Sequence, residues 1–457
     1  MKSNVLFFLI DSFRADKCNG DNKTSITPNI DNLIKNGVFF SQAISSSSAT
    51  VQSLATICTG LYPFNAGVSG MSYREMSWKA RSYFEDFKEN GYNIIASVPE
   101  FASSVGLKTH FKRKYKPYHN VPMLFDGLGH DIIKFLDSEK LKEPWFLFLH
   151  FLDLHYLVWL PDEFKSKKYG INPYERMISA IDVWIGRILE KIDLNKTLVV
   201  LTADHGEYVP DITNDEQEIQ YEHGIIDRTL WKIGSKFPSS LMTARNRVYD
   251  KFQKSMKKIQ LASHKTKNLR PYQKRAFLGA RGNIGNDFHV YDEILRIPLI
   301  FSGFGIHKPK IISQQVRHVD IFPTIAEVIQ LPKRDVKING NSLRPLLDGK
   351  TLQVSPVYFE SAPGISKPKD QICGLRTTEY KYSRNKDGSN EKAKLFDLQK
   401  DPFEENNIAQ EKPDIVNKLE KILMEIMNND LSQDYREEMS KEEAKKIEDE
   451  LKKLGYI

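Results

Sequence analysis

The chain has 457 residues, more than one hydrophobic core usually supports, so we expect a large domain with a smaller one attached. Its composition, 40% hydrophobic and 27% charged, excludes a disordered or fibrous protein. The three cysteines, Cys18, Cys58 and Cys373, are far apart in the sequence, which excludes a disulfide framework and favours a reducing compartment.

Apolar runs rich in β-branched and aromatic residues alternate with helical patterns along the chain. We predict strands at Val5–Ile10, Ile94–Val98, Trp145–His150, Thr197–Thr202 and Ile297–Phe301. We predict helices at Ile30–Asn36, Arg81–Asn90, Pro173–Ile192 and Ile321–Ile329. This alternation predicts an α/β three-layer sandwich whose large, mainly parallel sheet is covered on both faces.

The pattern changes near residue 351, where short runs typical of an antiparallel sheet begin. These are Val357–Phe359, Ile372–Arg376, Tyr380–Arg384 and Lys394–Asp397, and a charged helical tail follows from Asp414. We therefore expect a catalytic domain over 1–350 and a C-terminal subdomain over 351–457. The first apolar run is too short for a signal peptide or a membrane span, so we expect a cytoplasmic protein.

Acidic and imidazole side chains lie shortly after three of the predicted strands. Asp11 follows the first strand, Asp153 and His155 follow the third, and Asp204 with His205 follow the fourth. In α/β sheets the chemistry gathers at the carboxyl ends of the strands. A single aspartate there is often a turn or cap residue, but Asp11, Asp204 and His205 together suit a divalent cation.

A run of hydroxyl residues, Ser45 to Ser53, precedes an apolar stretch that ends at Thr59-Gly60. Hydroxyls in such a position are commonly simple N-caps. A hydroxyl at a helix start can also be held beside a metal, where the helix dipole stabilises negative charge on its oxygen.

Several short blocks together resemble the sulfatase family of the alkaline phosphatase superfamily. They include Asn4 to Asp11, Arg14-Ala15-Asp16, Thr59 to Pro63, Thr202 to Glu207, Tyr291-Asp292-Glu293, His318 to Thr324 and Leu395 to Pro402. The resemblance covers nearly the whole chain in the right order and includes the ending Leu454-Gly455-Tyr456-Ile457.

This resemblance implies a metal-assisted hydrolase of sulfate or phosphate esters, of the sulfuric ester hydrolase or phosphodiesterase type. It places Asp11, Asp204 and His205 as metal ligands. It also places Thr50 at the nucleophile position, within reach of the metal, and His155 at the histidine that contacts the ester oxygens. The alternative interpretation of His155 is a histidine of the core with no catalytic role.

Departures from the family pattern sharpen this expectation. Sulfatases that make formylglycine carry Cys or Ser, then Pro two residues later and Arg four residues later, whereas this chain has Thr50, Gln52 and Leu54. We therefore expect no formylglycine. With threonine at this position, the chain resembles the branch of the family that includes phosphoglycerol transferases and phosphonate hydrolases. This resemblance implies a threonine ester intermediate that is cleaved by water or by an acceptor alcohol.

Two features of the site are not decided by the sequence: the identity and number of the metal ions, and which further histidine lies in the site. Ser12 stands where many sulfatases have a second metal-binding aspartate, so one calcium, magnesium or manganese ion is expected. Either His223 or His289 could contact the anion. Alternatively, one of them could join Asp153 and His155 in a second metal site, although we favour a single metal.

The net charge of +7 is concentrated in one segment, residues 225–286, which looks like an insertion between two motifs of the site. It holds 15 Lys or Arg and two acidic residues, so it carries +13 and the remainder of the chain carries −6. Val248, Phe252, Met256 and Ile259 form one stripe of a basic helix. Such a helix can pack on the domain, attract a polyanionic substrate, or contact an anionic membrane; we expect no specific nucleic acid, because no nucleic-acid motif accompanies the charge.

Two alternatives to the favoured hydrolase follow from these features. One is a phosphoglycerol- or phosphoethanolamine-type transferase that acts on lipid or polymer headgroups. The other is a catalytically inactive polyanion- or membrane-binding protein. In either case, residues 225–286 allow a cytoplasmic protein that is peripheral to the membrane. The presence of Asp11, Asp204, His205 and His155 favours the enzymes over the inactive protein.

Overall fold

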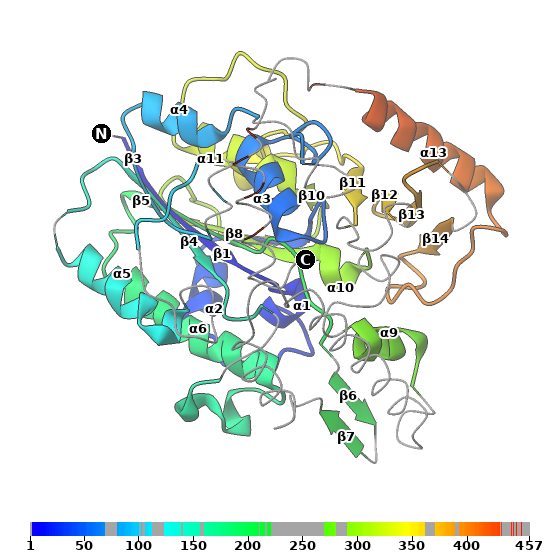
Figure 1. Ribbon diagram of the computed structural model, residues 1–457, viewed down its shortest axis with the longest axis horizontal. Helices are drawn as coiled ribbons and strands as arrows, with labels where there is room; N and C mark the ends of the chain where they lie inside the picture. Colours follow the sequence, from blue (N-terminus) through cyan, green and yellow to red (C-terminus); the bar gives the residue numbers. More distant parts are fainter. Residues whose placement is uncertain are drawn as a thin grey trace.

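A computed structural model gives the architecture of the chain (Figure 1). It describes residues 2–68, 80–99, 102, 106–111, 123–138, 140–155, 160–209, 211–214, 217–220, 269–279, 290–361, 371–388, 393–429, 431, 440, 442, 445 and 449. None of the helices in this part of the chain combines the length and apolar character that crossing a bilayer requires.

The large sheet has eight strands in the described part of the chain, in the order β10-β2-β8-β5-β1-β4-β3, with β9 beside β2. Their bounds are β1 Asn4–Ile10, β2 Val38–Ile44, β3 Asn93–Ser97, β4 Trp145–Phe151, β5 Thr197–Thr202, β8 Arg296–Gly303, β9 Lys310–Ile312 and β10 Val316–Arg317. Strand β1 runs parallel to both β4 and β5, whereas β8 runs antiparallel to both β5 and β2. The sheet is therefore mixed and mainly parallel, as predicted.

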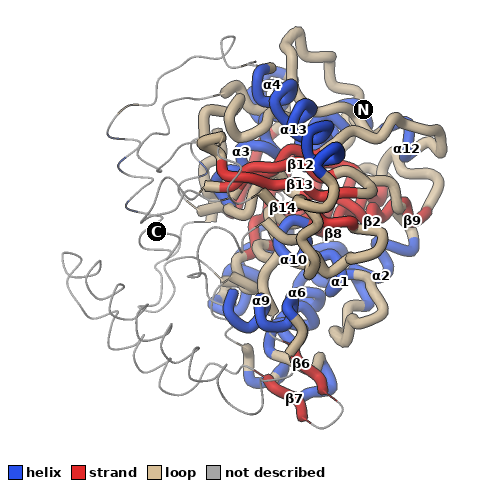
Figure 2. Tube along the Cα trace, turned by 90° about the vertical axis from the view of Figure 1, so that its right-hand side faces the viewer, coloured by secondary structure: helices blue, strands red, loops and turns tan. Residues whose placement is uncertain are grey.

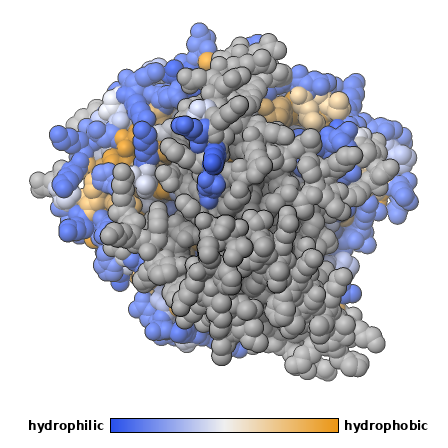
Figure 3. Space-filling model, in the orientation of Figure 1, coloured by the Kyte–Doolittle hydropathy of each residue, from blue (hydrophilic) through white to orange (hydrophobic). Residues whose placement is uncertain are grey.

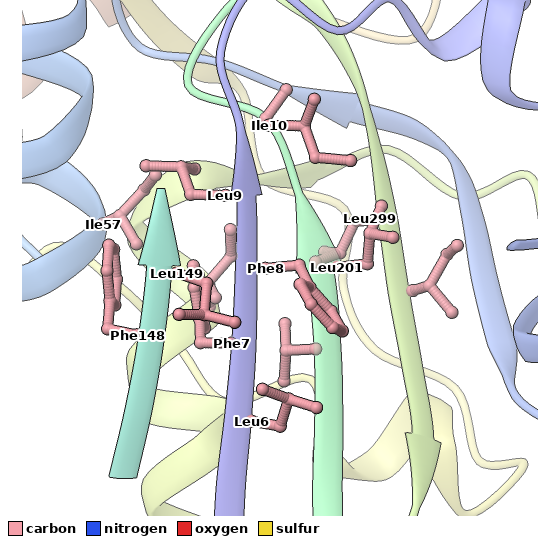
Figure 4. Packing of buried hydrophobic residues seen from close by; sticks show 14 of the residues in the cluster. Leu6, Phe7, Phe8, Leu9, Ile10, Ile57, Phe148, Leu149, Leu201 and Leu299 are labelled. Atoms are coloured by element: carbon pink, nitrogen blue, oxygen red, sulfur yellow. The ribbon is translucent and has the colours of Figure 1, made fainter. Parts of the chain in front are cut away.

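The central strands are buried on both faces because helices cover the sheet from each side. Helices α1 Ala15–Cys18, α2 Pro28–Lys35, α5 Leu128–Leu136 and α6 Pro173–Leu189 lie on one face, and α3 Thr50–Thr59, α4 Tyr83–Glu89 and α11 Ile321–Val328 lie on the other (Figures 1 and 2). Phe7 and Phe148 stack with ring centroids 4.8 Å apart between β1 and β4 (Figure 4). Continuous apolar strands of this kind belong inside a three-layer sandwich.

A separate antiparallel sheet follows in the C-terminal part of the chain, as the sequence predicts. Its strands are β11 Val357–Glu360, β12 Ile372–Arg376, β13 Tyr380–Asn385 and β14 Lys394–Asp397, and α13 Pro413–Asn428 packs against β12 and β13. Shorter elements complete the described fold: η3 Leu124–Asp126, η4 Asp162–Phe164, η5 Lys167–Tyr169, β6 Asp211–Asn214, β7 Gln217–Gln220, α9 Pro271–Gly279, α10 Asp292–Leu295, η9 His318–Asp320 and α12 Arg344–Leu347.

Strand β2 is the main element that the sequence analysis missed. Its residues Val38-Phe39-Phe40 are buried, but Ser41 and Gln42 interrupt the apolar run, and the register with β8 shifts between Phe40 and Ala43. The irregular stretch hides the strand pattern in the sequence. The predicted basic helix over 248–259 lies outside the described residues.

The described surface is mostly hydrophilic around the rim of the view in Figure 3, with hydrophobic residues gathered at the left and at the upper right. Among the described residues, the exposed large apolar side chains are Ile26, Val183, Leu194, Ile311, Val354, Phe403 and Met424. They come from elements far apart in the sequence, which is ordinary for a folded protein. All three cysteines are buried and free, as expected.

Buried charges join the small sheet to the large one. Asp292 of α10 accepts hydrogen bonds from Arg376 of β12 at 2.8 Å and from Lys381 of β13 at 3.0 Å. Arg376 also donates to Gln315 at 2.6 Å, next to β10. These charge-assisted bonds hold the C-terminal sheet against the turn that precedes β8.

We predict that Arg376→Met lowers the free energy of unfolding by about 3–5 kcal/mol, because it removes one partner of a buried charged pair. Denaturant unfolding measures this loss. The matched control is Arg344→Met, whose partner Asp348 lies four residues away at a more exposed site; it should cost less than about 1 kcal/mol. Equal losses in the two variants would contradict the structural role of Arg376.

Candidate active site

Two neighbouring strands bring the predicted metal ligands together. Strands β1 and β5 are parallel, with Leu9 opposite Thr202, so Asp11 and Asp204 leave the same edge of the sheet. Asp11 and Asp204 are fully buried and His205 is nearly so. One ligand atom from each of the three lies within 4.8 Å of the others.

Thr50 is the first residue of α3, at the same edge. Its hydroxyl lies 3.3 Å from Asp11 Oδ2 and 3.3 Å from His205 Nε2. The preceding serine loop is tied to the site, because Ser45 donates to the backbone carbonyl of Asp204 at 2.8 Å. The helix start predicted from the hydroxyl run therefore lies directly beside the acidic cluster.

Hydrogen bonds fix the directions of the ligand atoms. Asp204 Oδ1 accepts the backbone N–H groups of Ser12 at 3.1 Å and His205 at 2.8 Å, while Asp204 Oδ2 has no hydrogen-bond partner within the described structure. The Nδ1 atom of His205 lies 2.8 Å from the carbonyl of Gly206. Since a carbonyl only accepts, Nδ1 carries the proton and Nε2 presents its lone pair to the cluster.

Ser12 supports the site without adding a carboxylate. Its hydroxyl donates to Asp11 Oδ1 at 3.0 Å, and its φ of 61° lies in the left-handed region. A non-glycine residue in this region is strained, and such strain is common at functional sites. Ser12 therefore orients Asp11 through its side chain and Asp204 through its backbone.

The two carboxylates titrate differently because their surroundings differ. Burial raises the pKa of Asp11, but the histidines around it, led by His155, outweigh burial and hold this pKa well below the usual range. Burial, with the charge of Asp11 next, raises the pKa of Asp204. Two acids this close share negative charge poorly unless a cation joins them.

The histidines respond to the same cluster. Burial lowers the pKa of His205, but the charges of Asp204 and Asp11 outweigh it and raise the net pKa. Burial dominates at His155 and lowers its pKa, although Asp11 and Asp204 act in the opposite direction. The charges of Asp11 and Asp204 thus act on His155, whereas its predicted contact with the ester oxygens stays a prediction.

The donor set fits a divalent cation. Two buried carboxylates and an imidazole nitrogen are ligands for magnesium, manganese or calcium, and Asp204 Oδ2 is a buried acceptor without a hydrogen-bond donor. Among the residues that the structure describes, no other group of three acidic, histidine or cysteine side chains has this spacing.

The alternative second metal site is not assembled by the described residues. The Asp153 carboxylate accepts the backbone N–H of Leu124 at 3.1 Å and interacts with Asp126, so it faces η3. Although Asp153 is only two residues from His155 in the sequence, its carboxylate contacts η3 and not the acidic cluster. His223 and His289 both lie outside the described residues.

His150 is a site residue that the sequence analysis missed. It is 2% exposed, its Nε2 lies 3.3 Å from Asp11 Oδ2, and it sits opposite Leu9 on the strand next to β1. Neither ring nitrogen has a hydrogen bond of good geometry. The available signal was a lone histidine within the apolar run Trp145–Phe151, next to the last residue of that run.

The positions that would accompany formylglycine hold neutral residues. Gln52 is fully buried on α3 with neither amide atom hydrogen-bonded within the described structure, and Leu54 belongs to the apolar core. No arginine is therefore supplied from the fourth residue after Thr50.

Family models match most of the chain. The model described as "Sulfatase" matches residues 3–331, and the model described as "N-sulphoglucosamine sulphohydrolase, C-terminal" matches residues 286–429. The second match spans the small antiparallel sheet.

Among curated relatives, arylsulfatase K of Gallus gallus is 34% identical over 148 residues, 30% of this chain and 27% of the relative. The chain thus aligns with about a quarter of the length of that protein. The ulvan-active sulfatase of Formosa agariphila is 23% identical over 464 residues, covering 93% of this chain and 80% of the relative.

Solved structures share the fold at low identity. The phosphonate monoester hydrolase of Agrobacterium radiobacter superposes with a TM-score of 0.64 at 16% identity, covering 94% of this chain and 96% of that one. A 2-O GAG sulfatase superposes with a TM-score of 0.63 at 17% identity, covering 94% and 93%. These likenesses establish the architecture.

Asp153 gives a test of how the strand end is built. Burial raises the pKa of Asp153 from 3.8 to about 7, so the folded protein keeps a proton that the unfolded chain releases within this window. This carboxyl therefore lowers stability as the pH rises towards 7. We predict that Asp153→Asn becomes more stable relative to wild type by about 1.4 kcal/mol per pH unit between about pH 5 and pH 7, and levels off above.

Denaturant unfolding at several pH values measures this difference. Asp137→Asn, at an exposed surface pair with Lys191, is the control and should show no such slope. A difference between Asp153→Asn and wild type that stays constant with pH would contradict a buried, protonated Asp153.

Proposed function

The chain belongs to the sulfatase family, and on this premise we propose that it is a metal-dependent hydrolase of sulfate or phosphate esters with Thr50 as nucleophile. The observation that carries the proposal is the place of the Thr50 hydroxyl, 3.3 Å from both Asp11 Oδ2 and His205 Nε2. A hydroxyl beside a metal-ligand cluster and at a helix start is suited to nucleophilic attack.

The proposed ligands are Asp11, Asp204 and His205. A divalent cation there would stabilise negative charge on the threonine oxygen and on the oxygens of the ester. The N-terminus of α3 adds backbone N–H groups that favour an anion at the same place.

The reaction has two displacements in this proposal. The Thr50 hydroxyl gives up its proton as its oxygen attacks the sulfur or phosphorus atom, the bond from that atom to the ester oxygen breaks, and the leaving alcohol takes up that proton. Water then attacks the same atom, which frees the threonine hydroxyl and releases inorganic sulfate or phosphate. His155, whose pKa responds to the charges of Asp11 and Asp204, contacts the ester oxygens in this proposal.

Phosphate and sulfate esters are both within the reach of this chemistry. An unmodified threonine leaves a covalent ester that water must open, a route that suits phosphoryl transfer. One structural neighbour is named a phosphonate monoester hydrolase, which is consistent with an ester hydrolase of either kind on this fold.

We propose anionic polymers as the substrate class. Residues 225–286 carry a net charge of +13 and would raise the local concentration of a polyanion near the site. The relatives and neighbours include an ulvan-active sulfatase, a 2-O GAG sulfatase and a protein solved with D-glucosamine-2-N,6-O-disulfate. The same segment could instead bring the enzyme to an anionic membrane surface, and binding to anionic vesicles separates the two partners.

We predict that Thr50→Ala lowers kcat/KM by at least about a thousandfold and leaves metal binding intact, because only the nucleophile is removed. Thr50→Ser keeps the hydroxyl and should stay within about tenfold of wild type. The assay compares aryl sulfate, aryl phosphate, an aryl phosphodiester and a sulfated polysaccharide with added magnesium, manganese or calcium.

Thr56→Ala is the matched control, because Thr56 is a buried threonine of the same helix. Its activity should remain close to that of wild type. Full activity of Thr50→Ala on every substrate would remove Thr50 from the mechanism, and no dependence on divalent metal would remove the cation.

A further inference from the structure

Helix α9 is the described helix of the basic segment 225–286, and it docks on the C-terminal subdomain. The Tyr272 ring stacks on Phe403 with centroids 4.5 Å apart. Glu405 accepts the backbone N–H of Tyr272 at 3.2 Å and also pairs with Arg270. The ribbon and tube views both place α9 near α10, which precedes β8 (Figures 1 and 2).

Arg275 of α9 is buried where three parts of the chain meet. It donates to Glu293 Oε1 at 2.7 Å, to the carbonyl of Phe403 at 2.8 Å and to the carbonyl of Glu404 at 3.2 Å. Its guanidinium lies 3.6 Å from the centroid of the Tyr291 ring. A planar group with several fixed donors can hold such a junction in a way that a lysine cannot.

The backbone of Glu293, the partner of Arg275, packs directly against residues 206–208. We call these residues the ligand turn, because they follow the proposed metal ligand His205. A Cβ atom at Gly206 would lie 2.1 Å from the carbonyl oxygen of Glu293, so the two backbones pack too closely to leave room for a side chain at position 206. The Gly206 N–H donates to the carbonyl of Ile294 at 2.6 Å. The Gly206 carbonyl in turn accepts the proton of His205 Nδ1 at 2.8 Å.

The far end of α9 contacts the same turn a second time. A Cβ atom at Gly279 would lie 2.1 Å from the ring of Tyr208, so the helix packs closely on the residue two positions after Gly206. Tyr208 is 2% exposed and forms a small apolar cluster with Ala276 and Ile294. Residues 206–208 are therefore held between α9 and α10.

We propose that Arg275 is a positioning residue for the metal site: it fixes Glu293 against Gly206 and so keeps His205 Nε2 aimed at the cation. This inference rests on the proposed metal site at Asp11, Asp204 and His205. It gives the basic segment a mechanical role, since part of it braces the ligand turn that precedes it in the chain. Mutation of a residue that orients a metal-binding side chain indirectly commonly lowers metal affinity by about 10–100-fold.

The test compares Mn²⁺ binding to full-length wild type, Arg275→Met, Arg275→Lys and Arg270→Met. Arg270 directly precedes α9 and pairs with Glu405 of the same loop, but its side chain is exposed, so it controls for docking of α9. Calorimetry gives the affinity, and the electron paramagnetic resonance spectrum of bound Mn²⁺ reports its ligand geometry. Unfolding midpoints measured in parallel separate folding from ligand placement.

We expect about tenfold weaker Mn²⁺ binding and an altered spectrum for Arg275→Met, with Arg270→Met within about twofold of wild type. Arg275→Lys keeps a charge for Glu293 and should recover part of the affinity; it carries the test alone if Arg275→Met does not fold. Wild-type affinity in both Arg275 variants, or equal weakening in Arg270→Met, would overturn the inference. Failure of wild type to bind Mn²⁺ would overturn the proposed metal site and the inference together.

Discussion

Two buried carboxylates at the ends of adjacent parallel strands are the constraint on which the site depends. Asp11 and Asp204 are fully buried, and burying two like charges side by side is expensive unless a cation or protons compensate them. The surrounding histidines compensate part of this charge. A divalent ion at the proposed ligands Asp11, Asp204 and His205 would compensate the remaining charge.

The fold meets this constraint with supports from distant parts of the sequence. Ser12 bonds to both aspartates, Ser45 ties the loop before Thr50 to Asp204, and Gly206 fixes the tautomer of His205. Behind Gly206 stand Glu293 and the Arg275 of α9. The core sheet therefore places the ligands, and the supporting contacts determine where their atoms point.

The sequence was sufficient for the large sheet, the small antiparallel sheet and the grouping of Asp11, Asp204 and His205, because strand-like runs end at Ile10 and Thr202 and the acids follow within two residues. That these side chains bind a metal stays a prediction. It was insufficient where a property depends on neighbours that only folding supplies. His150 lies close to Asp11 because β4 is next to β1. Asp153 contacts Leu124 and not the cluster of Asp11, Asp204 and His205. Strand β2 was hidden by Ser41 and Gln42, and nothing in the sequence pairs Arg275 with Glu293.

The central claim is that Asp11, Asp204 and His205 hold one divalent ion next to the Thr50 hydroxyl. The most direct measurement is a crystal structure of the full chain grown with Mn²⁺, with data collected for anomalous scattering at the manganese edge. The account predicts one strong peak within about 2.5 Å of a carboxylate oxygen of each aspartate and of His205 Nε2, with Thr50 Oγ1 beside it. A peak held by other side chains, or no peak at this edge of the sheet, would contradict it.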